Sequence, residues 1–124
     1  MSQSVPVLDL TRLAAGDLSA NQFHGVVISA AHTVNVAGDN VPIFGVLQDL
    51  PEAAGRAARV RCAGTSKVKA GAAFAAGAGL TTDANGKFVT AAAGEHRSAI
   101  ASEAATAEDD IVEALLTPGG AVPA

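Results

Sequence analysis

The chain has 124 residues, of which 49% are hydrophobic, 16% are charged and only 3% are aromatic, with a formal net charge of −4. This length suits one domain, and the acidic balance argues against a nucleic-acid-binding protein, which requires a concentrated cationic face. Because alanine is the largest part of the hydrophobic class, the core is expected to be thin and to gain from oligomerisation or docking. The low charge likewise suits a surface that packs against copies of itself or a partner.

Residues 1–16 are predicted to form an N-terminal arm ahead of a body over residues 17–124. Asp9 is available as an N-cap and Gly16 as a stop, which together predict one short helical turn at Leu10 to Ala15. Pro6 favours an extended start to the arm. Two alternatives stay open, because the arm can pack on its own body or reach over a neighbouring subunit.

The body is predicted to be all β. Its strand signals are β-branched residues and period-two alternation between turn residues, and the expected strands are residues 23–28, 32–36, 43–48, 57–63, 66–69, 81–82, 87–90, 98–104 and 111–116. In the expected strand over residues 57–63, alternation puts Val60 and Cys62 inward, with Arg59 and Arg61 outward. The Asn85-Gly86 pair predicts a hairpin turn, because both residues tolerate positive φ. Residues 70–79 are expected to form an irregular crossing with Phe74 as its anchor.

Side chains that carry chemistry are scarce, since the chain has one Cys, three His, no Trp and no Tyr. Cys62 has no disulfide partner and is interpreted as a small buried hydrophobic residue. His24, His32 and His96 are dispersed, without the spacing of metal ligands or of a catalytic group. No catalytic, cofactor-binding or metal-binding residue is therefore expected.

Neither a membrane segment nor a secretion signal is expected. The longest apolar run, Ala70 to Leu80, is interrupted by glycines and is far shorter than the roughly 20 residues that span a bilayer. The N-terminus lacks the cationic start and apolar run of a signal peptide. The protein is accordingly expected to be made in a reducing cytoplasm and to bind no membrane.

Charge is divided along the chain. Basic residues gather in the middle and acidic residues at the end: Arg56, Arg59, Arg61, Lys67 and Lys69 against Glu95, Glu103, Glu108, Asp109, Asp110 and Glu113. This division can pair neighbouring strands within one subunit or join subunits. Exposed pairs of this kind would set orientation more than affinity.

Five segments, in this order, resemble the capsid cement or head decoration proteins of tailed bacteriophages: Ala15 to Phe23, Pro42 to Gln48, Gly64 to Ala72, Asp83 to Lys87 and Ile111 to Gly120. The resemblance spans most of the chain from Ala15 onward. It implies a mainly β fold, a small antiparallel β-barrel-like (β-tulip type) single domain carrying an extended N-terminal arm. It also implies a homotrimer without catalytic activity. Such a trimer binds the outer capsid surface of the virion at threefold and quasi-threefold sites, where major capsid protein subunits meet.

The resemblance and the apolar arm together give a hypothesis for the interface. The expected capsid or inter-subunit contacts are Val5, Val7, Leu8, Leu10, Leu13, Asp17, Leu18, Gln22 and Phe23. Deleting residues 2–13 is expected to weaken capsid binding and to leave the body folded. The main rival interpretation is a tail or fibre component. A carbohydrate-binding module fits poorly because it depends on stacking aromatics, and a hydrolytic or metal-dependent enzyme fits less well still.

Overall fold

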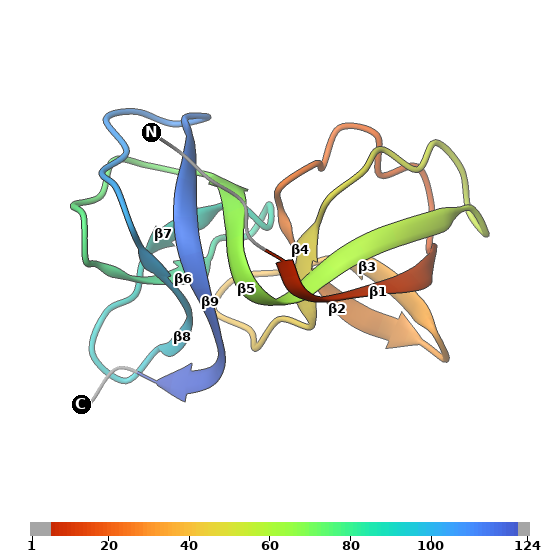
Figure 1. Cartoon of the computed structure of the whole chain (residues 1–124), viewed down its shortest axis with the longest axis horizontal. Coiled ribbons are helices and arrows are strands. Elements are labelled where there is room, and N and C mark those ends of the chain that lie inside the picture. Colours follow the sequence, from red (N-terminus) through yellow and green to blue (C-terminus); the bar gives the residue numbers. More distant parts are fainter. Residues whose placement is uncertain (1–5, 122–124) are drawn as a thin grey trace.

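The computed structural model describes residues 6–121, and within that range the chain is all β, as predicted (Figure 1). The described strands form one hydrogen-bonded sheet in the order β1-β3-β2-β4-β5-β9-β8-β6-β7. Their bounds are β1 Pro6–Ala14, β2 Gly25–Ala30, β3 Thr33–Val36, β4 Gly45–Leu47, β5 Ala57–Lys69, β6 Gly79–Thr82, β7 Phe88–Thr90, β8 His96–Ala101 and β9 Ile111–Ala121. Over these residues, no helix is long and apolar enough to cross a membrane.

The first five strands pair in a closed circuit, which we call ring A. β1 runs antiparallel to β5, from Pro6 opposite Gly64 to Leu13 opposite Ala57, and its end runs parallel to β3. β3 then pairs with β2, β2 with β4, and β4 with β5. β1 therefore closes ring A, because it pairs with β5 and also with β3.

A second circuit, ring B, contains β5, β9, β8, β6 and β7. A bridge between Ala70 and Phe88 closes it, with the Gly71 amide donating to the Phe88 carbonyl at 2.7 Å. β5 belongs to both rings because its 13 residues run from one half of the molecule into the other (Figure 1). Gly64, with a φ of 97°, lies where β5 leaves ring A, a backbone conformation that favours glycine.

Each ring has its own core. Ring A encloses a small cluster that includes Val34, Leu47 and Val60. The larger cluster of ring B contains many alanines beside Phe74, Leu80 and Phe88, which agrees with the thin core expected from composition. β2 and β4 lie between the clusters. Successive residues point to opposite faces of a strand, so Val26 and Leu47 pack in one core while Val27 and Val46 pack in the other.

Most of the predicted elements are confirmed. The turn around Asn85-Gly86 joins β6 to β7, with the Asp83 carboxylate accepting from the amides of Asn85 at 2.8 Å and Lys87 at 3.1 Å. The segment after β5 is irregular, with Phe74 buried at its centre. The two predicted strands over residues 57–69 are one continuous strand, β5.

Two predictions are wrong. The helical turn at Leu10 to Ala15 does not form, because residues 6–14 pair along β5 and that register outweighs a weak local capping signal. Arg61 does not point to solvent but is 6% exposed. Its guanidinium lies where β5 bends between the rings and is held by Asp9 and by the Thr65 carbonyl.

Candidate functional site

β1 exposes three large apolar side chains, two of them adjacent in the chain. Val7 is 74% exposed, and Leu8 and Leu13 are each 46% exposed, although all three lie in a strand that is paired along β5. Leu10 is half-buried. Exposed apolar side chains close together are typical of an interaction surface. Three of the predicted contact residues, Val7, Leu8 and Leu13, are therefore accessible on one strand.

The predicted residues that follow β1 have roles inside the fold. Leu18 is buried in the core of ring A. Gln22 donates to the Gln48 carbonyl at 3.0 Å, and Phe23 packs on the core of ring B. Asp17 is exposed, and its carboxylate accepts from the Ser19 amide and hydroxyl, which lowers the pKa of Asp17. Val5 lies outside the described residues.

An ion pair fixes β1 to β5. The Asp9 carboxylate accepts two hydrogen bonds from the Arg61 guanidinium, at 2.8 and 3.1 Å, and Arg59 lies 3.8 Å away. The side chain of Arg61 is 7% exposed and that of Asp9 is 21% exposed. The hydrogen bond from Arg61 holds the pKa of Asp9 below its usual range. β1 is thus held firmly enough to present its exposed side chains in a fixed arrangement.

β9 brings further apolar side chains toward β1. Leu8 pairs with Ala63 and Leu115 pairs with Thr65, two residues apart on β5. β1 and β4 pair with opposite edges of β5, and the order β4-β5-β9 puts β9 on the same edge as β1. Leu115 is 44% exposed. We call Val7, Leu8 and Leu115 the β1–β9 patch. Sequence reasoning missed Leu115, because only the register of both strands on β5 places it beside β1.

The divided charges act mainly between neighbouring strands of one chain. Lys67 on β5 lies opposite Glu113 on β9. Lys87 contacts Glu108 at 3.1 Å and Asp109 at 2.7 Å, which joins the β6–β7 turn to the loop before β9. Hydrogen bonding to Asp109 raises the pKa of Lys87. The Lys67 and Glu113 positions match the prediction of pairing between neighbouring strands within one subunit, whereas Arg59 and Arg61 pair with Asp9 of β1, outside the predicted acidic group.

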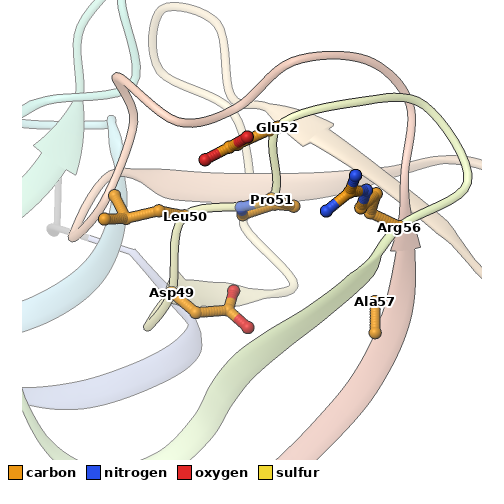
Figure 2. A pocket seen from close by; sticks show the side chains of 6 residues that line it. All are labelled: Asp49, Leu50, Pro51, Glu52, Arg56 and Ala57. Carbon is orange, nitrogen blue, oxygen red and sulfur yellow. The ribbon is translucent and has the colours of Figure 1, made fainter.

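A shallow pocket of about 340 Å³ lies at the connection between β4 and β5. Figure 2 shows Asp49 and Arg56 lining it, with Leu50, Pro51, Glu52 and Ala57. The Asp49 carboxylate accepts from the Arg59 amide at 3.1 Å, so it stabilises the connection to β5. Neither a cysteine nor a histidine lines this pocket.

Potential catalytic groups elsewhere in the described chain are equally isolated. Cys62 is half-buried, and burial raises the pKa of its thiol, which disfavours the reactive thiolate. Within residues 6–121, no group of three or more His, Cys, Asp or Glu side chains is placed to hold a metal ion. The apolar surface on β1 and β9 is the most distinctive feature available for function.

Comparison with known proteins points the same way. Residues 2–116 match a family model described as phage cement protein. A solved structure, the N base of head fiber gp8.5 in bacteriophage phi29, has a similar fold, with a TM-score of 0.70 and 18% sequence identity over 89% of this chain and 93% of that chain. No curated protein sequence matches significantly.

Proposed function

Because the chain belongs to the phage cement protein family, a phage structural family, we propose that it binds the outer surface of the icosahedral capsid and stabilises the shell against internal DNA pressure. The proposed form is a homotrimer, bound at threefold and quasi-threefold sites where subunits of the major capsid protein meet. The proposed role is structural and needs no catalysis, cofactor, nucleic acid or membrane.

The observation that carries this proposal is the β1–β9 patch on a fixed strand. Val7 and Leu8 are exposed although the ion pair between Asp9 and Arg61 anchors β1 immediately beside them. A rigid apolar surface loses little conformational entropy when it docks, which favours binding. We propose that this patch, with Leu13, forms the capsid or inter-subunit contact, and that Leu18, Gln22 and Phe23 support it from within the fold.

The closed circuit of pairings in ring A supports a barrel-like body for this role. A closed circuit reduces the number of free strand edges that would otherwise promote aggregation. Strong attachment then follows from multivalency. Three weak contacts act together in a trimer, because the second and third form at high effective concentration once the first has formed.

Substitution of the patch tests this assignment. We expect Val7→Asp with Leu8→Asp to weaken co-sedimentation with expanded, undecorated shells at least about tenfold, because one lost apolar contact costs roughly 1.5–3 kcal/mol and about 1.4 kcal/mol is a factor of ten. Ile28→Asp on β2 is the matched control, since Ile28 is 46% exposed, as Leu8 is. Wild-type binding by the double variant would show that another surface makes the contact.

Point substitutions test the patch more sharply than deletion of residues 2–13. The deletion removes most of β1, including Asp9, and with it the strand that closes ring A. Loss of binding by such a protein would not separate a missing contact from a damaged fold.

A second candidate is the base of a fibre carried on the head. The fold similarity to the N base of a phi29 head fiber favours it, because that similarity covers 93% of the other chain. The two candidates differ in what else is bound. A cement trimer needs only the shell, whereas a fibre base must also hold a fibre segment, which a pull-down from infected cells followed by electron microscopy would reveal.

A further inference from the structure

His24 is buried at the contact between the two rings. It is 3% exposed and immediately precedes β2 of ring A. Its Nδ1 lies 2.8 Å from the carbonyl oxygen of Asn85 in the β6–β7 turn of ring B. Beside it, the Gly25 amide donates to the Gly86 carbonyl at 2.8 Å, and the Lys69 amide donates to the Phe23 carbonyl at 3.0 Å.

The contact with Asn85 sets the tautomer of the neutral His24 ring. A carbonyl oxygen can only accept, so Nδ1 carries the hydrogen and the neutral ring keeps a lone pair on Nε2. Nε2 is buried and has no hydrogen-bond partner among the described residues. A proton added there would create a buried cation whose new N–H has no acceptor, which is costly.

Some of the charged groups around His24 favour its protonated form and others disfavour it. Lys69 at the end of β5 and Lys87 after the turn disfavour the cation, while Asp83 in the turn favours it. Asp109, in the loop before β9, also interacts with His24, but its carboxylate is paired with Lys87 at 2.7 Å. Burial is the largest effect and lowers the pKa of His24, against the hydrogen bond to the Asn85 carbonyl, which favours the protonated ring.

The backbone at this contact is strained as well. Phe23 has a φ of 66°, which is unusual for a bulky residue and strains the backbone. The hydrogen bonds of Phe23 to Leu47 and Lys69 hold it there. Weakening the adjacent contact at His24 would therefore remove part of what maintains this conformation.

We propose that His24 is an acid-sensitive latch, which holds ring A to the β6–β7 turn of ring B while neutral and releases that contact when protonated. Because the neutral form is favoured in the folded state, the stability contributed by His24 is complete above the unfolded pKa, about 6.5. It is lost as the pH falls from there toward the lower folded pKa. One consequence rests on the proposed function: a decorated shell would lose its decoration on mild acidification.

The test compares wild type with His24→Gln, whose amide can donate to the Asn85 carbonyl but does not titrate. Urea unfolding of the free full-length chain is followed between pH 7.5 and 5.5. We expect the wild-type midpoint to fall with pH and the His24→Gln midpoint to stay nearly constant, while His96→Gln, at an exposed histidine, falls as wild type does. A parallel fall in His24→Gln would overturn the latch.

Histidine NMR of the wild-type protein provides a second measurement that does not depend on the variant folding. We expect the His24 ring to become protonated at a lower pH than free histidine, with protection of the Gly25 amide from exchange falling as the ring becomes protonated. A ring that titrates like that of free histidine would also overturn the latch. Shell binding at pH 7.5 tests the proposed function separately, because the latch is closed there.

Discussion

Gly86→Ala is expected to lower the free energy of unfolding by about 2–5 kcal/mol, which is a large part of the roughly 5–15 kcal/mol of an ordinary domain. Gly86 has a φ of 78°, and a Cβ atom there would lie 2.4 Å from Cγ2 of Val36 and 3.1 Å from the Gly25 carbonyl oxygen. An alanine is therefore strained by its backbone conformation and also collides with ring A. Urea denaturation at neutral pH measures the loss.

Gly77→Ala is the matched control for this prediction. Gly77 has a φ of 85°, but a Cβ atom there would meet no heavy atom within 4 Å. It reports the conformational cost alone, about 1–2 kcal/mol. Equal losses in the two variants would mean that Val36 moves aside for the added Cβ atom at no cost in stability.

Asp9→Ala is expected to cost about 2–4 kcal/mol, because it removes the carboxylate from a guanidinium that is largely withdrawn from water. The expected loss is toward the lower end of what breaking a buried ion pair usually costs, since the Asp9 side chain remains 21% exposed. Adding Arg61→Met should recover part of the loss, because no buried cation then remains. Glu108→Ala, which removes an exposed partner of Lys87, should change stability little.

The contribution of Asp9 to the stability of the fold decreases as the pH falls. The folded pKa of Asp9 is lowered by Arg61, so its stabilising effect is complete above the unfolded pKa of about 3.9 and is lost as the pH falls through the folded pKa. The difference in stability between wild type and Asp9→Ala should therefore shrink below about pH 4. A difference that stays constant to pH 2.5 would show that packing, not charge, is what Asp9 contributes.

The local signals in the sequence predicted the parts of the fold that depend on local chemistry. Asn85-Gly86 predicted the hairpin turn, in which Gly86 supplies the positive φ of 78°. The β-branched residues up to Ile28 predicted β2, because such residues favour a strand locally. The ordered motifs from Ala15 to Gly120 led to the family, which the match over residues 2–116 confirms.

The features that the sequence did not reveal depend on residues far apart in the chain. Asp9 and Gly16 offered the two ends of a helical turn, yet β5, some 50 residues later, pairs with the segment between them as a strand. Arg61 alternates like an outward residue, and only the bend of β5 and Asp9 bring it inside. His24 has no neighbouring motif at all, because its partner is the backbone of Asn85, whose side chain plays no part in the contact.

The central claim is that this chain is a cement that binds the shell, and co-sedimentation with expanded, undecorated shells of its own phage tests it most directly. Quantifying bound protein against shell concentration, with light scattering on the free protein, gives both the stoichiometry and the oligomeric state. We predict saturation at three copies of the chain for each threefold and quasi-threefold site. Absence of binding to expanded shells by folded protein would contradict the account and favour a role elsewhere in the virion.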